Sequence, residues 1–474
     1  MTFGNVPQVF SGNVTFDSNV AAGITYTMAT NALNVGGTLT IQNSAPSPTG
    51  NTVLNTSLSN LAIAAVAFTL ASTGTLVANG STITVTSIDT HLGAFTVGTS
   101  TVVVNASGGS VNISQTVNNL TVNPGINTTF SGSLTWSGAL IFTSATVSFG
   151  ASSLTSSGAA SISFASATIT MSTGNWNTAS AATFTATSSA VTLSGTGSLM
   201  IGASASFAAL TISGGTRTLA SQLATSGPLI LSGGVLAKGT NPLTIGAGLT
   251  MSGGALSSTS GAVTVAGNVN ISAAASYIAF GSESWMVAGS WTNASTSASW
   301  SAGTATVTFT APVSQTMTFA ALPGNAHEFC NVVFNAGAST VTFTMATNAL
   351  SWSGTLTVQG VPGTTTLLTS DLGLNGGAVT VGNGGVLTAN ASAAVVSNVS
   401  LTGGTSGTIT LTTGSWTVGG NWDTSGAGST LSTGTSTVTF TGAAMTINLA
   451  VGQRFWNLTV SGTVSILSTV TASA

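Results

Sequence analysis

The sequence predicts an all-β protein, built as one elongated parallel β-helix (β-solenoid) that runs continuously over residues 1–474. Three observations lead to this fold class. Apolar and polar residues alternate with a period of two, long uncharged stretches recur along the chain, and no convincing amphipathic helix is visible.

Short strand patterns cover most of the chain. ATVTF (305–309), GTLTV (354–358) and STVTFTG (436–442) alternate an apolar residue with Thr or Ser. Such alternation is typical of a strand with one buried face, and β-branched residues favour the pleated conformation. Gly, Asn and Ser clusters separate the patterns at short intervals, as expected for turns between strands.

The stretch LAIAAVAFTLA (61–71) is the only candidate helix, and a pair of buried strands explains it equally well. It is also the longest apolar stretch, and a membrane-spanning helix needs about 20 apolar residues. We therefore expect no membrane span.

Internal repeats provide the strongest evidence for stacking. Residues 25–43 (TYTMATNALNVGGTLTIQN) and 342–360 (TFTMATNALSWSGTLTVQG) agree at 13 of 19 positions. Residues 284–310 align with 415–441 at an offset of 131, which matches Trp285 with Trp416 and Trp291 with Trp422. A unit that stacks on copies of itself needs this kind of repetition.

A strand that begins with Asn follows these blocks. It occurs in HEFCNVVF (327–334), QRFWNLTV (453–460) and, with one extra residue, QVFSGNVTF (8–16). A fainter version is NLTV (119–122) followed by LTWSG (134–138), whose counterpart is LSWSG (350–354). The repeat pattern is weakest over 145–280.

Coils of roughly 20 residues, stacked about 4.8 Å apart, would give about 20 coils. The alternative fold is a string of immunoglobulin-like β-sandwiches of about 100 residues each, which the offset of 131 would permit. The shorter, variable distances between the repeats favour the solenoid.

Charge is almost absent, with three Lys or Arg and six Asp or Glu in 474 residues. A nucleic-acid partner is not expected, because binding needs clustered cations. Cys330 is the only cysteine, so no intrachain disulfide can form. The start of the chain, MTFGNVPQVFSG, shows no signal peptide, and we expect a mature or truncated sequence from outside the cell or from its surface.

The charged residues are too dispersed to predict an active site. Glycoside hydrolysis needs paired carboxylates, and no two acidic residues here lie within 40 residues of each other. The cations Arg217, Lys238 and Arg454 are equally scattered. His327-Glu328 beside Cys330, and Asp89 with His91, are more simply explained as turns, so we expect no enzyme, no cofactor and no metal.

Two further sets of residues are candidates for surface roles. The tryptophans recur at matching repeat positions, which favours core packing or a lateral contact over a sugar-binding face. The sequon N-x-[ST] marks candidate glycosylation sites at Asn13, Asn55, Asn79, Asn105, Asn112, Asn119, Asn127, Asn270, Asn293, Asn390, Asn398 and Asn457. An intact mass equal to that of the bare polypeptide would exclude glycans.

The string GxW…GTxTVTFTG…FxNLTV…VTVxGTLTV resembles the repeats of secreted bacterial and archaeal right-handed parallel β-helix proteins. These include autotransporter-like adhesins and other large cell-surface proteins. The resemblance is clearest over about 280–470 and 1–45, and it implies a fold and a cell-surface setting rather than a chemistry. The scarcity of charge departs from most such adhesins and favours packed, self-assembling material.

We therefore expect a structural subunit of an extracellular filament, sheath or surface layer. The chain is expected to stack on itself head to tail, and laterally as a further mode, because both ends carry the Asn-led strand without a polar cap. The predicted interface residues are Phe10, Asn13, Val14, Phe16, Phe455, Trp456, Asn457, Leu458 and Val460. The alternatives are an adhesin that binds surface glycans, an ice-binding protein with flat Thr ladders and, more remotely, a polysaccharide lyase or hydrolase.

Overall fold

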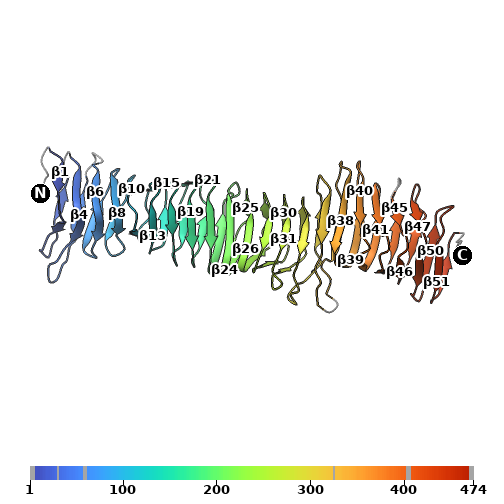
Figure 1. Cartoon of the computed structure of the whole chain (residues 1–474). Coiled ribbons are helices and arrows are strands. Elements are labelled where there is room, and N and C mark those ends of the chain that lie inside the picture. The colour runs from blue at the N-terminus through green and yellow to red at the C-terminus, as the bar shows by residue number, and fades with distance from the viewer. Residues whose placement is uncertain (1–5, 29–30, 57–60, 324–325, 402–406, 469–474) are drawn as a thin grey trace. The chain divides into compact units, whose positions relative to one another are not determined.

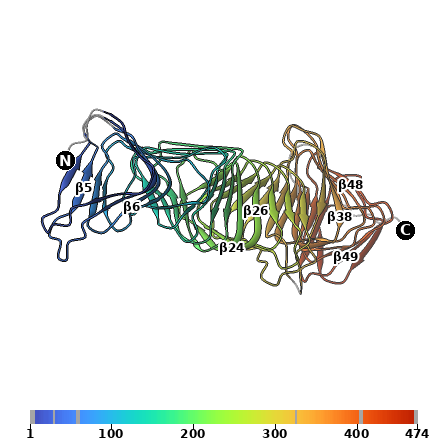
Figure 2. The same ribbon diagram turned by 60° about the vertical axis from the view of Figure 1, so that its left-hand side comes forward.

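The computed structural model describes residues 6–28, 31–56, 61–323, 326–401 and 407–468. Its contacts divide the chain into two compact units, Met1–Ser226 (unit 1) and Gly227–Ala474 (unit 2), which we treat separately. In each unit, successive strands stack side by side as coils of one winding (Figures 1 and 2). Within the described residues every element is a β-strand, and every strand pairing is parallel.

Three ladders of strands build unit 1. The first consists of β1 (Gln8–Phe10), the first halves of β4 (Leu33–Gln42), β6 (Ile63–Leu70) and β8 (Thr82–Asp89), then β10 (Thr101–Val104), β12 (Asn119–Val122), β15 (Ala139–Thr143), β18 (Ser161–Ala165) and β21 (Thr183–Thr187). The second consists of β2 (Val14–Asp17), the second halves of β4, β6 and β8, then β11 (Gly109–Asn112), β13 (Asn127–Phe130), β16 (Thr146–Ser148), β19 (Thr168–Met171), β22 (Ala190–Leu193) and the first half of β24 (Ala209–Leu219).

The third side of unit 1 has two parts, followed by β25 (Leu223–Thr225). The first part consists of β3 (Thr25–Thr27), β5 (Thr52–Asn55), β7 (Gly74–Val77) and β9 (Ala94–Thr96). The second consists of β14 (Leu134–Trp136), β17 (Leu154–Ser156), β20 (Trp176–Thr178), β23 (Gly197–Ile201) and the second half of β24.

Unit 2 repeats the plan with four ladders. The first consists of β27 (Leu243–Ile245), β30 (Ala262–Val265), β33 (Ser284–Val287), β35 (Thr306–Phe309), β37 (Asn331–Phe334), the second halves of β39 (Leu350–Val358) and β41 (Leu374–Val381), then β44 (Val399–Leu401), β47 (Trp422–Thr424), β50 (Met445–Leu449) and β52 (Val464–Ile466). The second consists of the first halves of β39 and β41, then β43 (Ala394–Val396), β46 (Ser415–Val418), β49 (Thr437–Phe440) and β51 (Asn457–Val460).

The other two ladders both begin in β26 (Leu229–Gly239). Its first half is followed by β28 (Leu249–Met251), β31 (Val269–Ile271), β34 (Trp291–Asn293), β36 (Gln315–Thr318), β38 (Val341–Thr347), β40 (Thr365–Leu368), β42 (Gly385–Thr388), β45 (Thr408–Thr410) and β48 (Thr430–Ser432). Its second half is followed by β29 (Ala255–Ser258) and β32 (Tyr277–Ala279).

The period-two pattern explains why the side chains sort as they do. In β35 (TVTF) the two Thr residues are partly exposed, while Val307 and Phe309 are buried and lie over Val332 and Phe334 of the next coil. Successive side chains of a strand point to opposite faces, so each coil adds its apolar residues to ladders inside the winding. The solenoid prediction is confirmed, and the immunoglobulin-like alternative is wrong because its sheets would be antiparallel. One continuous solenoid through both units stays a prediction.

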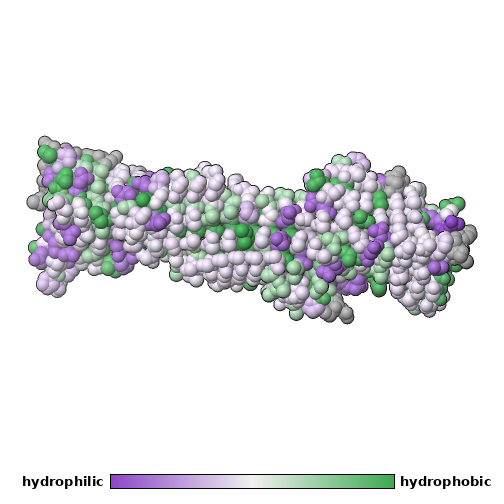
Figure 3. Space-filling model, in the orientation of Figure 1, coloured by the Kyte–Doolittle hydropathy of each residue, from purple (hydrophilic) through white to green (hydrophobic). Residues whose placement is uncertain are grey.

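Coil length varies with the turns rather than with the strands. Val102 lies opposite Leu120, 18 positions on, whereas Leu33 lies opposite Ile63, 30 positions on. The stretch 61–71, the one candidate helix, forms β6. On the face in Figure 3, most residues are close to neutral in hydropathy, and the strongly apolar or hydrophilic ones are scattered among them.

Candidate functional site

The first candidate site is the outer edge of the first described strands. In the described part of the chain, β1 and β2 pair only with β4, so the opposite edge of each strand has no partner strand. Apolar side chains of β1 remain accessible, since Val9 is 73% and Phe10 38% exposed. Both also line one end of an open hollow of about 450 Å³ that continues over the following coils as far as Ala106. Such an edge presents free backbone groups that favour pairing with another chain.

The last described strands form a second open edge. There β51 pairs only with β49, and β52 only with β50. Val460, Ile466 and Leu467 are exposed, and Asn457 is exposed at the start of β51. Neither edge carries a Lys, the residue that commonly protects strand edges from pairing.

The predicted interface residues therefore differ in accessibility. Phe10, Asn13, Asn457 and Val460 are exposed, whereas Phe16 and Phe455 lie in the core. The half-buried ones are Val14, Trp456 and Leu458. The buried pair can support a contact but cannot form its outer surface.

A recurrent contact between an asparagine and a glycine, here called the Asn–Gly contact, joins neighbouring coils. The Asn side chain before a strand accepts, at Oδ1, a hydrogen bond from the backbone N–H directly opposite in the next coil. Five examples have donor–acceptor distances of 2.7–3.0 Å: Asn13 with Thr38, Asn119 with Ala139, Asn268 with Ser290, Asn331 with Thr355, and Asn398 with Asn421.

Glycine precedes the donor in all five Asn–Gly contacts. A Cβ atom at Gly37, Gly138, Gly289, Gly354 or Gly420 would lie 2.3–2.4 Å from the asparagine Oδ1. Atoms cannot approach that closely, so in these five contacts glycine leaves the space that the amide oxygen occupies. The related bond from Thr446 N–H to Asn421 Oδ1, at 2.8 Å, forms with Met445 before the donor. The Asn-led strand found in the sequence is therefore one half of a coil-to-coil contact, and an SG, GG or AG bend in the next coil is the other half.

The most polar part of the core surrounds Glu328, which is fully buried just before β37. Its Oε1 accepts hydrogen bonds from Trp291 Nε1 at 2.7 Å and Asn293 Nδ2 at 2.8 Å. Its Oε2 accepts one from the backbone N–H of Ala320 at 2.8 Å. Glu328 lies in the bend before the Asn-led strand, as the sequence predicted, and the structure adds that its side chain is buried.

The path of the chain around Glu328 explains why its side chain lies in the core. Trp291 lies opposite Met317, 26 positions on, so the coil here is long and the segment after β36 folds inward. Burial raises the pKa of Glu328 to about 7, because a charge is unfavourable away from water, and the three donated hydrogen bonds oppose this shift. No substrate can reach this carboxyl, so we assign it to holding the long coil in place.

Two further reactive side chains lie beside Glu328 in the sequence. His327 Nδ1 is buried without a hydrogen-bond partner in the described residues, and Cys330 is a half-buried free thiol. Across the described ranges, no group of three or more His, Cys, Asp or Glu side chains could hold a metal ion.

Other charged residues are also buried, which the sequence did not predict. The Arg217 guanidinium donates to the backbone carbonyls of Gly174 at 2.6 Å and Ser172 at 3.1 Å, and burial lowers its pKa. Lys238 donates to the carbonyl of Ser260; burial lowers its pKa, and the nearby carboxylate of Glu283 opposes the shift. These cations satisfy backbone oxygens at turns rather than lining a groove.

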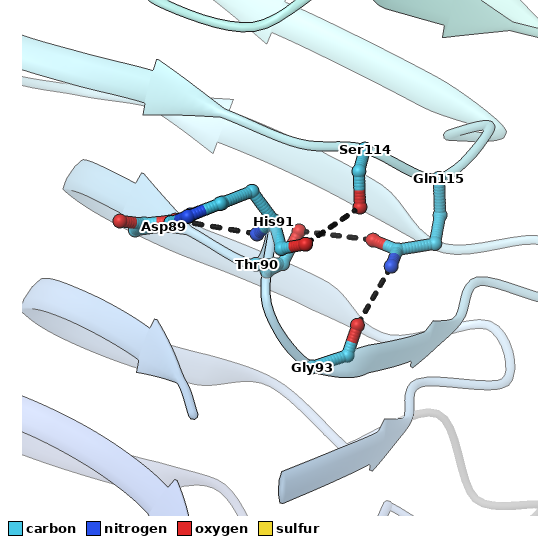
Figure 4. Close-up of polar contacts among 6 residues, drawn as sticks. All are labelled: Asp89, Thr90, His91, Gly93, Ser114 and Gln115. Carbon is cyan, nitrogen blue, oxygen red and sulfur yellow. Dashed lines mark hydrogen bonds and ion pairs between the residues drawn. The ribbon is translucent and has the colours of Figure 1, made fainter. Parts of the chain in front are cut away.

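Asp89 ends β8 and His91 lies in the turn that follows, and both side chains are partly exposed (Figure 4). Asp89 Oδ1 contacts His91 Nδ1 at 2.5 Å and accepts the backbone N–H of His91 at 3.2 Å. Gln115 donates from Nε2 to the carbonyl of Gly93 at 2.7 Å and fixes the turn against the next coil. The arrangement fits the turn that the sequence predicted.

Tryptophans form the core rather than a binding face. All are buried except Trp456, which is half-buried: Trp136, Trp176, Trp285, Trp291, Trp300, Trp352, Trp416 and Trp422. The core interpretation is confirmed for these eight, so their rings cannot form an exposed sugar-binding face.

The candidate glycosylation sites differ in access. Asn13, Asn105, Asn127, Asn270, Asn398 and Asn457 are exposed, and Asn55, Asn79, Asn112, Asn119 and Asn390 are half-buried. Asn293 is fully buried and donates to Glu328, so a glycan cannot be attached to it in the folded chain.

Comparisons with known proteins found no matching family model, no matching curated protein and no matching solved structure. The described residues contain no helix with the length and hydropathy needed to cross a membrane.

Proposed function

We propose that this chain is a structural subunit that stacks end to end with copies of itself into an extracellular filament, sheath or surface layer, and that it is not an enzyme. One observation carries the proposal. The first and last described strands leave backbone groups and apolar side chains unpaired, although every pairing between the coils has the same parallel geometry. A solenoid coil is completed by a neighbouring coil, and a second copy can supply it.

The near absence of charge supports the same proposal. Like-charged surfaces keep proteins apart, and this chain has nine charged residues among 474. Four of them, Arg217, Lys238, Glu283 and Glu328, are buried. Little electrostatic repulsion therefore opposes association of two copies.

Sedimentation velocity over a range of concentrations, with electron microscopy of the same samples, tests the proposal. We expect species that grow with concentration into filaments. A single monomeric species at every concentration would contradict the proposal.

Two lysine substitutions, one at the last edge and one away from it, test whether this edge forms the contact. Val460→Lys places a cation on the edge strand β51, which pairs on one side only within the described residues and where Val460 is 44% exposed, and should abolish assembly. Val395→Lys places the same charge on a residue that is 56% exposed in β43, which is paired on both sides, and should leave assembly intact.

A further inference from the structure

We infer that the stacking contact has a fixed register, in which Asn457 of one copy and Gly12-Asn13 of a second copy form an Asn–Gly contact. The inference rests on the end-to-end assembly proposed above and specifies how the two edges meet. Each edge carries one half of the contact, and the described residues of the chain do not complete either half.

A hydrogen bond to the preceding coil already orients the Asn457 side chain for the contact. Its Nδ2 donates to Thr437 Oγ1 of the preceding coil at 3.4 Å. Asn119, which forms a complete Asn–Gly contact, donates to Thr101 Oγ1 at the same distance while its Oδ1 accepts the N–H of Ala139. At Asn457, no donor within the described residues reaches Oδ1, and the side chain is exposed.

The Gly12-Asn13 half has free space and a free N–H group where Asn457 of another copy would bind. Val14 lies opposite Leu39, so Gly12 and Asn13 occupy the positions that face Gly37 and Thr38 in the next coil. A Cβ atom at Gly12 would meet nothing within 4 Å, whereas one at Gly37 would collide with Asn13 Oδ1. The backbone N–H of Asn13 has no acceptor among the described residues and points to the same open edge.

The internal repeat predicts what else this register brings together. Asn331 is the counterpart of Asn457, and β37 pairs with the second half of β39, so that Val332 faces Leu356 and Phe334 faces Val358. By the same rule, β2 of the second copy pairs with β51. Val14 of the second copy then lies over Leu458, and Phe16 lies over Val460.

A competing register can be set aside on chemical grounds. Superposing Ser11-Gly12 on Ser461-Gly462 would pair β1 with β51 and β2 with β52. Asn457 would then face Pro7, and proline has no N–H to donate. The Asn–Gly contact would be lost in that arrangement.

Cysteine cross-linking distinguishes the two registers. In a Cys330→Ser background, Thr15→Cys combined with Thr459→Cys places two exposed thiols directly opposite each other in the inferred register. Adjacent strands lie about 4.8 Å apart, which is within the Cα separation that a disulfide spans. We expect oxidation to give covalent dimers and longer oligomers.

The matched control pairs Thr459→Cys with Val9→Cys, which face each other only in the competing register. Covalent oligomers from the control pair and none from the first pair would overturn the inferred register. Filaments that cross-link with neither pair would also overturn it, while leaving the proposed assembly standing. A monomeric parent protein would contradict both.

Gly12→Ala tests directly whether Asn457 of a neighbouring copy occupies the space beside Gly12. The substitution should leave the unfolding midpoint unchanged, because the added methyl group meets no atom of the described residues of its own copy. It should raise the critical concentration for assembly at least tenfold, because it would meet Asn457 Oδ1 of the neighbouring copy. An unchanged critical concentration would contradict the inference, and Gly37→Ala, which clashes inside the fold, should lower the unfolding midpoint instead.

Discussion

Unit 2 contains two copies of the same sequence block, which begin at residues 284 and 415. Both build the same aromatic core, but the polar groups around the tryptophans differ. Trp291 packs on Phe329 with ring centroids 5.3 Å apart, and Trp422 packs on Phe455 at the same distance. Trp285 lies 6.4 Å from Trp291, and Trp416 lies 6.0 Å from Trp422. The aromatic geometry has been kept between the copies.

The polar groups beneath those rings have changed. In the first copy, Glu283 accepts the indole N–H of Trp285 at 3.1 Å, and Glu328 accepts that of Trp291. In the second copy, Gly414 and the exposed Arg454 stand at these positions, and the indole N–H groups of Trp416 and Trp422 have no hydrogen-bond partner among the described residues.

Neutral Gln453 takes over part of the role of Glu328 in the second copy. Its Oε1 accepts from Thr424 Oγ1 at 2.5 Å and from the backbone N–H of Ala450 at 3.3 Å. These donors correspond to Asn293 and Ala320 of the first copy. Aromatic packing and hydrogen bonds to the backbone therefore hold the coil in both copies, whereas the buried carboxylates occur in the first copy only.

The largest expected effect comes from removing the central ring. Trp291→Ala and Trp422→Ala should each destabilise their coils by about 3–5 kcal/mol through the cavity they leave. Trp291→Ala should cost about 1–3 kcal/mol more, because Glu328 loses a donor while it stays buried. Hydrogen exchange of the amides in β34 and β47 measures both local openings, and equal losses in the two copies would contradict the account.

The second-largest effect is on the pH dependence of stability, which should differ between the two copies. The pKa of Glu328 is raised from 4.5 to about 7 in the folded chain, so the folded state binds the proton more tightly than the unfolded state. The first copy should therefore be most stable below about pH 4.5 and lose about 3 kcal/mol as pH rises through 7.

Exchange protection of β34 and β36 against pH, corrected for intrinsic rates, measures this loss. Glu328→Gln should flatten the profile, because no proton can then be released. The strands β47 and β50 serve as the internal control, since Gln453 does not titrate. A pH profile in β34 that survives Glu328→Gln would mean that another group is responsible.

A smaller effect should distinguish the indole N–H groups alone. Trp291→Phe removes a donor from a buried carboxylate and should cost about 1–3 kcal/mol in addition to the lost ring volume. Trp422→Phe removes an N–H group that has no partner, so the same loss of volume should be partly offset. The difference between the two midpoints in urea measures the effect, and a larger cost at Trp422 would contradict the assignment of partners.

Salt should have the smallest effect and should not separate the copies. The one ion pair within the described residues joins the partly exposed side chains of Asp89 and His91 in unit 1. Raising NaCl from 0.05 to 0.5 M should therefore change the free energy of unfolding by less than about 0.5 kcal/mol. A larger shift would show that charge contributes to the coils after all.

The strands, their parallel stacking and the tryptophan core could be predicted because they depend on local patterns that recur. The alternation in β35 and β49, for example, places Val307 and Val438 inside without reference to any distant residue. The Asn-led strand is also a local pattern, whereas its partner glycine lies in the next coil and depends on the register between coils.

The burial of Glu328, Arg217 and Lys238 could not be predicted in the same way. The repeat aligns Glu328 with Arg454 in the turn before the Asn-led strand, and a turn by itself does not indicate burial. Its burial depends on the inward path of the long coil and on donors from Trp291, Asn293 and Ala320. One signal was present in the sequence, because Asn293 replaces the Thr found at position 424 of the other copy.

Electron cryo-microscopy of the purified chain at increasing concentration shows directly whether the coils continue from one copy into the next. We expect filaments in which the strand spacing of about 4.8 Å runs without interruption through the contact between copies. Separate particles at every concentration, or filaments in which that spacing is broken at each contact, would contradict this expectation.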